Sequence, residues 1–117
     1  MAKLTIYHNP RCTKSREALE RLADRKVPHE VVLYLDAPLS KTQLQDLVKQ
    51  VGGDPNQLLR RKDPKFKEAG FDPQKNYSAS EVVALLAEHG HLMERPVAVK
   101  GSRAVVARPA ERLDDLL

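Results

Sequence analysis

The only cysteine of the chain, Cys12, stands in the segment HNPRCTKSR, directly before a predicted helix. Free backbone N–H groups and the dipole at a helix N-terminus favour negative charge. Arg11, Lys14 and Arg16 add positive charge around the sulfur, and a turn can fold His8 towards it. A lone cysteine is commonly a buried core residue, but these surroundings lower a thiol pKa and favour the nucleophilic thiolate. We therefore predict that Cys12 is a reactive thiol.

The residues after Cys12 exclude two familiar thiol sites. Phosphatase-like loops need a wider spacing between cysteine and arginine than that of Cys12 and Arg16. A dithiol redox motif needs a second cysteine at position 15, where this chain has Ser15. The Ser15 hydroxyl can donate a hydrogen bond to a thiolate but cannot close a disulfide. Because the chain has no other cysteine, a thiol from outside must release an oxidised or product-bound Cys12.

Composition narrows the class of protein. The chain has 117 residues, a formal net charge of +4 and 4% aromatic residues, and its basic residues are interleaved with acidic ones. So few aromatic rings give bases little to stack on, and we expect no nucleic-acid partner. No apolar run can span a bilayer and no signal-peptide pattern is present, so we expect no membrane association and a reducing cytoplasm. His89 and His91 lack a spaced third ligand, so we expect no metal site.

Alternating and helical periodicities predict the elements that position Cys12. Residues 3–7 and 30–35 are short and β-rich, and residues 13–26 repeat apolar positions at helical spacing. This order predicts a βαβ unit with two parallel strands and a right-handed crossover. It places Cys12 in the turn between the first strand and the helix.

Residues 38–92 are expected to form a helical insert. A capping serine begins a helix over 40–51 that a glycine pair stops, and a second serine begins a helix over 78–90. Three prolines predict short helices joined by turns over 54–77. Two short strands and a final amphipathic stretch follow. The chain is therefore predicted to be one α/β domain over 1–117, in which a four-stranded mixed sheet carries helices on both faces.

The last two predicted strands, 96–100 and 103–107, flank a two-residue turn with glycine at its first position. This register places Arg95 opposite Arg108. Two like charges facing each other repel, so stability alone does not favour the arrangement. A shared oxyanion held by two planar guanidinium groups would explain it, and so would two solvated arginines that stay apart. The hairpin by itself leaves both interpretations open.

Several motifs, in this order, resemble the ArsC-type arsenate reductase family across essentially the whole chain. They are the first strand with HNPRCTKSREAL, then LYL, LLRRKD, ERPVAV and ARPAE. The resemblance implies a thioredoxin-like fold with the order βαβ, helical insert, ββα and a third strand antiparallel to the first. It also implies that Pro96 is a cis proline facing Cys12, and that Arg95 and Arg108 lie at the same sheet edge as Cys12.

The resemblance also implies a reaction. In this family a cysteine thiolate attacks arsenate while three arginines hold the oxyanion, and the matching positions are Cys12 with Arg60, Arg95 and Arg108. Pattern alone leaves Arg60 and Arg61 unassigned, and the resemblance selects Arg60.

The remaining expectations concern the thiol's neighbours and the reductant. Ser15 and Arg16 complete the expected substrate-binding residues, and His8 is expected to tune Cys12 as a second catalytic residue. The family resolves the cysteine–arsenic adduct with glutathione and glutaredoxin, which agrees with a single cysteine. We therefore expect glutathione as a co-substrate, no bound cofactor, and a monomer.

Two alternatives stay open. A monothiol, glutathione-dependent oxidoreductase of another substrate would need the same reactive Cys12. A regulator resembling Spx would share the fold and bind RNA polymerase. Such regulators commonly carry a CxxC switch where this chain has CTKS, which argues against that alternative.

Overall fold

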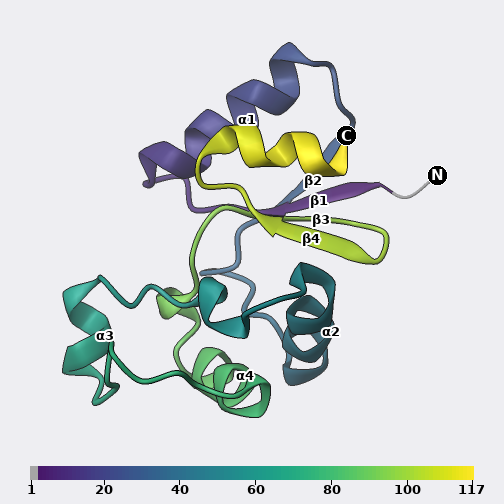
Figure 1. Ribbon diagram of the computed structural model, residues 1–117. Coiled ribbons are helices and arrows are strands. Elements are labelled where there is room, and N and C mark those ends of the chain that lie inside the picture. Colours follow the sequence, from purple (N-terminus) through teal and green to yellow (C-terminus); the bar gives the residue numbers. More distant parts are fainter. Residues whose placement is uncertain (1–2) are drawn as a thin grey trace.

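The computed structural model describes residues 3–117 and contains a four-stranded mixed sheet in the order β2-β1-β3-β4 (Figure 1). The strands are β1 (Leu4–Tyr7), β2 (His29–Val32), β3 (Val97–Lys100) and β4 (Arg103–Val106). β1 pairs in parallel with β2 and antiparallel with β3, and β3 pairs antiparallel with β4. The predicted thioredoxin-like sheet, with its parallel βαβ unit, is confirmed.

Helix α1 (Thr13–Asp24) connects β1 to β2 and begins directly after Cys12, which is its N-cap residue. It ends two residues before the predicted boundary at Lys26. Lys26 adopts the left-handed conformation, with φ of 55°, and the backbone N–H of Val27 donates to the Leu22 carbonyl at 3.0 Å. This bond closes the last turn, so the helix cannot continue.

Strand β2 is shorter than the predicted strand over 30–35, and that prediction was wrong at its C-terminal end. The backbone N–H of His8 donates to the Val32 carbonyl at 2.9 Å, and this is the last bond between the two segments. The chain after β1 then turns towards Cys12, so residues beyond Val32 have no partner strand. They form a turn instead, in which Ala37 N–H donates to the Leu33 carbonyl at 2.9 Å.

The segment between β2 and β3 is helical, as predicted. It contains α2 (Lys41–Val51), η1 (Pro55–Leu58), α3 (Pro64–Glu68), α4 (Ala79–Glu88) and η2 (Gly90–Leu92). The two long helices each begin at a serine whose hydroxyl accepts a backbone N–H, within a reciprocal capping box. The predicted short helices over 54–77 are present as η1 and α3. The helix predicted over 78–90 ends at Glu88, because the next residue leaves helical geometry.

The β3–β4 hairpin has the predicted register, with Lys100 opposite Arg103 and Gly101 in the left-handed conformation. The backbone N–H of Ala107 donates to the Pro96 carbonyl at 2.9 Å, which extends the same register beyond the strands. Arg95 and Arg108 come next along the two segments, and Arg108 Nη1 lies 3.4 Å from the Arg95 carbonyl. The final amphipathic stretch forms the 3₁₀ helix η3 (Ala110–Leu116), which contacts α1 and β4.

Helices cover both faces of the sheet, as predicted, and each face has its own core (Figure 1). On one face, Val97 and Val106 pack in a cluster with residues of α2 and α4. On the other, Ile6 and Ala98 pack with residues of α1 and η3. Alternate strand residues point to opposite faces, so short strands of four residues supply both cores. No helix within residues 3–117 is long and apolar enough to cross a membrane.

Candidate active site

The turn after β1 holds the candidate nucleophile at the carboxyl edge of the sheet. The backbone N–H of Cys12 donates to the Asn9 carbonyl at 3.0 Å, and Arg11 N–H donates to the Asn9 side-chain oxygen at 3.0 Å. These bonds hold the turn closed on itself. Cys12 is 9% exposed, so its sulfur is shielded from bulk water without being sealed off.

The surroundings of Cys12 lower the pKa of its thiol below the ordinary value. The largest single effect is that of burial, which raises the pKa because it disfavours the charged form. The effects that lower the pKa together outweigh it. The backbone N–H groups of Ser15 and Lys14 at the helix N-terminus lower the pKa, and so does the nearby Arg95 guanidinium. The helix N-terminus thus acts as predicted. The strongest side-chain contribution, however, comes from Arg95 and not from the cations beside Cys12 in the sequence.

His8 and Ser15 form a buried pair next to the thiol. His8 Nδ1 lies 2.7 Å from Ser15 Oγ, and the backbone N–H of Asn9 donates to the same oxygen at 3.0 Å. His8 is 5% exposed and Ser15 is fully buried. Burial, and then the charge of Arg16, lower the pKa of His8, so the ring is neutral at pH 7. His8 is therefore paired with the Ser15 hydroxyl. The Ser15 backbone, and not the His8 ring, is among the causes that lower the pKa of Cys12.

Arg16 lies on the exposed side of α1. Its Nη2 donates to Thr13 Oγ1 at 3.2 Å, and its charge reaches His8. It does not line the basic cleft described next, so the structure separates it from the other predicted arginines.

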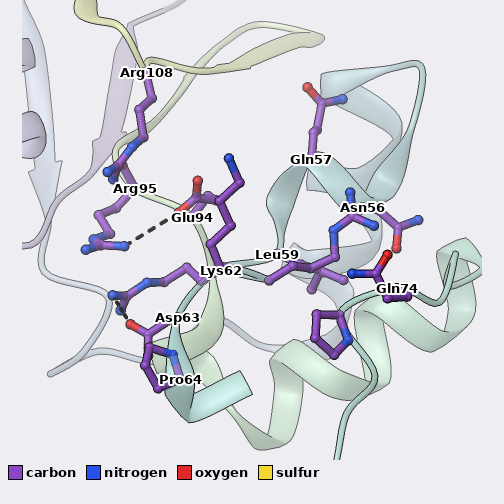
Figure 2. A pocket seen from close by; sticks show the side chains of 13 residues that line it. Asn56, Gln57, Leu59, Lys62, Asp63, Pro64, Gln74, Glu94, Arg95 and Arg108 are labelled. Carbon is purple, nitrogen blue, oxygen red and sulfur yellow. Dashed lines mark hydrogen bonds and ion pairs between the residues drawn. The ribbon is translucent and has the colours of Figure 1, made fainter. Parts of the chain in front are cut away.

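A cleft of about 910 Å³ brings the three predicted arginines together. Arg60 follows η1, Arg95 precedes β3 and Arg108 follows β4, and all three line its walls. In Figure 2, Arg95 and Arg108 lie side by side, while Asn56 and Gln74 line the opposite part. The Arg95–Pro96 and Arg108–Pro109 peptide bonds are both cis. The cleft also contains Arg61 and Lys62, so positive charge dominates it.

Backbone pairing explains how Arg60 reaches Arg95. Leu59 forms an isolated antiparallel bridge with Met93. The N–H of Arg60 donates to the Leu92 carbonyl at 2.8 Å, and the N–H of Glu94 donates to the Leu58 carbonyl at 2.7 Å. These hydrogen bonds hold the segment after η1 next to the segment that leads into β3. The sequence contains no local signal for this bridge.

Two carboxylates partly neutralise these arginines. Arg60 forms an ion pair with Asp63, and its Nη1 donates to the His91 carbonyl at 3.1 Å. Arg95 Nη1 lies 3.5 Å from Glu94 Oε1, while its Nε is buried without a hydrogen-bond partner among residues 3–117. Sequence reasoning missed both acidic residues. Each stands within three positions of its arginine, and that spacing was the available signal.

The third arginine contacts the backbone of the second. Arg108 Nη1 lies 3.4 Å from the Arg95 carbonyl, a long hydrogen bond. The two guanidinium groups thus face the same cleft from adjacent chain segments. A cleft with several planar cations can hold an oxyanion. Cys12 does not line this cleft, but Arg95, which does, also lowers the pKa of the Cys12 thiol.

Comparison with known proteins agrees with this geometry. The ArsC family pattern matches residues 7–116. A protein named arsenate reductase from Neisseria meningitidis serogroup A is 37% identical over 118 residues, covering 100% of both chains. One of the same name from Haemophilus influenzae is 36% identical, covering 96% of this chain and 97% of the relative. A solved structure titled arsenate reductase from Vibrio cholerae has a TM-score of 0.87 and 34% identity, covering 99% and 98%. The chain belongs to the ArsC family.

Proposed function

We propose that this protein reduces arsenate to arsenite with the Cys12 thiolate as its nucleophile. One observation carries the proposal: the Arg95 guanidinium lowers the pKa of Cys12 and also lines the basic cleft. A single side chain therefore connects an activated sulfur with an anion-binding surface. The family, and the names of relatives at 36–37% identity, support arsenate as the oxyanion.

Binding of the oxyanion comes first. Arsenate is a tetrahedral anion at neutral pH, so an anionic sulfur can approach it only if cations offset the repulsion. Arg60, Arg95 and Arg108 supply those cations from three separate segments. Among the residues that the structure describes, the Nε–H of Arg95 is a buried donor without an acceptor, and an arsenate oxygen would supply one. In this proposal the arginines stabilise the charge that builds up during attack.

The chemical step then balances as follows. The Cys12 sulfur forms a bond to arsenic, one arsenic–oxygen bond breaks, and the leaving oxygen takes up protons and departs as water. Arsenic stays in the +5 state in this step. A glutathione thiolate then attacks the Cys12 sulfur, the electron pair of the sulfur–arsenic bond stays with arsenic, and arsenite leaves. The two electrons come from the two thiols, which become a mixed disulfide on Cys12.

A thiol from outside the chain has to complete the cycle, because Cys12 is the only cysteine. We propose that glutaredoxin reduces the mixed disulfide by thiol–disulfide exchange. This scheme places a monomeric enzyme in a reducing cytoplasm, with glutathione as co-substrate and no bound cofactor.

The buried pair of His8 and Ser15 fits a supporting role. When neutral His8 carries its proton on Nδ1, it donates to Ser15 Oγ at 2.7 Å. Asn9 N–H donates to the same oxygen, so the hydroxyl proton of Ser15 is free to point towards the thiolate. In this proposal His8 orients Ser15, and Ser15 and the helix N-terminus together hold the negative sulfur. This scheme assigns no separate chemical step to Pro96 or Arg16.

Arsenite production in a coupled assay tests the proposal. Purified protein, arsenate, glutathione and glutaredoxin should give arsenite at a saturable rate, and Cys12→Ser should abolish it. Parallel reactions with thioredoxin in place of glutathione and glutaredoxin test the reductant. A wild-type rate no higher than that of Cys12→Ser would contradict arsenate reduction. Turnover of a glutathionylated substrate under the same conditions would instead favour the monothiol oxidoreductase.

A further inference from the structure

Glu94 places a carboxylate inside the basic cleft, next to one of the arginines proposed to hold the substrate. Its side chain and that of Arg95 line the same cleft, and Figure 2 marks the ion pair between them. The pair is long, with Arg95 Nη1 3.5 Å from Glu94 Oε1. A carboxylate repels any anion that enters the cleft, so its presence beside a binding arginine calls for a physical reason.

Stability does not explain this carboxylate. A charge-assisted hydrogen bond between a guanidinium and a carboxylate has a length of about 2.7 to 2.9 Å, and the contact with Arg95 is longer. Among residues 3–117 the Glu94 carboxylate accepts no hydrogen bond and forms no other ion pair. The side chains of Glu94 and Arg95 are 25% and 15% exposed, and a partly exposed ion pair of this kind adds little to stability.

The second carboxylate of the cleft, that of Asp63, has both of its oxygens engaged. Asp63 Oδ1 accepts the backbone N–H of Lys65 at 2.8 Å, which caps α3, and Oδ2 pairs with Arg60. Asp63 therefore neutralises an arginine and begins a helix at the same time. The Glu94 oxygens keep lone pairs that can accept a hydrogen bond from a bound molecule.

The backbone holds Glu94 in this place. Its N–H donates to the Leu58 carbonyl at 2.7 Å, and the preceding residue, Met93, bridges to Leu59. Arg95 is the next residue, so one segment presents the acceptor and the cation together. An anion bound to Arg95 Nη1 lies within reach of the Glu94 carboxylate, because the two groups are only 3.5 Å apart.

Tetrahedral oxyanions differ in whether they carry a proton. Near neutral pH, arsenate and phosphate keep at least one hydroxyl group, while sulfate and selenate have none. A hydroxyl group can donate a hydrogen bond to a carboxylate, and such a charge-assisted bond offsets the repulsion between the two anions. An anion without a proton has nothing to donate, so it meets the repulsion without compensation.

We propose that Glu94 is a specificity-determining residue, whose carboxylate accepts a hydrogen bond from the hydroxyl group of a protonated oxyanion held by Arg95. This role rests on the proposed function, because an oxyanion has to occupy the cleft. Glu94 selects arsenate and phosphate over sulfate and selenate by their proton, and not by their size or shape. The class of ligand is therefore a tetrahedral oxyanion that keeps a hydroxyl group at neutral pH.

Protection of Cys12 by four anions, in two matched pairs, tests the proposal. Slightly above neutral pH, arsenate and selenate are dianions of similar size, as are phosphate and sulfate, and each pair differs by one hydroxyl proton. Affinity is read from the concentration that halves the alkylation rate of Cys12 by iodoacetamide. The wild type should bind the protonated member of each pair at least about tenfold more tightly, since a hydrogen bond to a charged group contributes about 1.5 to 3 kcal/mol.

Glu94→Gln removes the charge and keeps the size of the side chain. It should bring the affinity ratio of each pair close to one, mainly by strengthening protection by sulfate and selenate. Asp63→Asn is the matched control, because it also removes one carboxylate from the cleft, but one that pairs with Arg60. It should strengthen protection by all four anions alike and leave both ratios at their wild-type values.

The outcomes separate this inference from the proposed function. Unchanged ratios in Glu94→Gln would overturn the role of Glu94 even if the protein produces arsenite. An equal gain for all four anions would also overturn it, because Glu94 would then only compete for Arg95. Altered ratios without arsenite production in the coupled assay would contradict arsenate reduction and leave the selectivity of Glu94 standing. Absence of protection by every anion in the wild type would overturn both.

Discussion

The buried side chain of Asn56 hydrogen-bonds the segment before Arg60 to the chain before α4. Replacing Asn56 with alanine should lower the free energy of unfolding. The side chain is 1% exposed. Its Nδ2 lies within hydrogen-bond distance of Asp54 Oδ1 at 2.9 Å, Asn76 Oδ1 at 2.9 Å and the Tyr77 carbonyl at 2.7 Å. Its Oδ1 accepts the backbone N–H of Tyr77 at 2.9 Å. One amide therefore connects η1 with the chain that leads into α4.

The magnitude follows from these contacts. An amide has two donor hydrogens and one acceptor oxygen, so Asn56→Ala removes three hydrogen bonds at about 1 kcal/mol each. It also leaves backbone groups of the buried Tyr77 without partners, which adds to the cost. We expect a loss of about 3 to 4 kcal/mol, a large part of the roughly 5 to 15 kcal/mol typical of a domain.

Urea unfolding measures this loss, with Gln57→Ala as the control. The neighbouring Gln57 is partly exposed and donates one bond, from Nε2 to the Gly52 carbonyl at 2.8 Å. Its replacement should change stability by about 0.5 kcal/mol or less. Asn56→Ala should lower the urea midpoint by about 1 to 4 M. If both variants unfold at the wild-type midpoint, the Asn56 network does not hold this segment and the reasoning is refuted.

Two further predictions concern the charges around the thiol. Arg95→Leu should move the pH profile of Cys12 alkylation to higher pH, because it removes the guanidinium that lowers the thiol pKa. The control variant Arg61→Leu, at another arginine of the same cleft, should leave the profile unchanged. Identical profiles for the two variants would contradict this assignment. Asp63→Asn keeps a side chain that can cap α3 but removes the charge paired with Arg60. Protection of Cys12 by sulfate should then strengthen about two- to fivefold, and weaker protection would show that Asp63 positions Arg60 instead of competing with the anion.

Features set by neighbouring residues could be predicted from the sequence. Ser40 and Ser78 begin helices because a hydroxyl can accept a backbone N–H three residues on. The two-residue turn at Gly101 determines the hairpin register, and that register brings the segments that carry Arg95 and Arg108 together. These are local rules, and the structure follows them.

Features set by distant segments could not be predicted. β2 ends at Val32 because the chain after β1 turns away, and nothing in residues 33–35 signals the loss of that partner. Arg60 reaches the cleft because the bridge between Leu59 and Met93 places it there. The family resemblance selected Arg60 as a site residue, but nothing in the sequence predicted the bridge. The cations beside Cys12 in sequence suggested how its pKa is lowered, yet Arg95 supplies the largest side-chain effect.

The pH dependence of Cys12 alkylation, with and without arsenate or sulfate, tests the central claim most directly. Thiolate is present above the thiol pKa and lost as pH falls through it, so the lowered pKa should keep Cys12 reactive at pH values where an ordinary cysteine is protonated. Either oxyanion should slow the reaction by occupying the basic cleft. An ordinary cysteine profile, with no protection by either anion, would contradict an activated thiolate beside an oxyanion site.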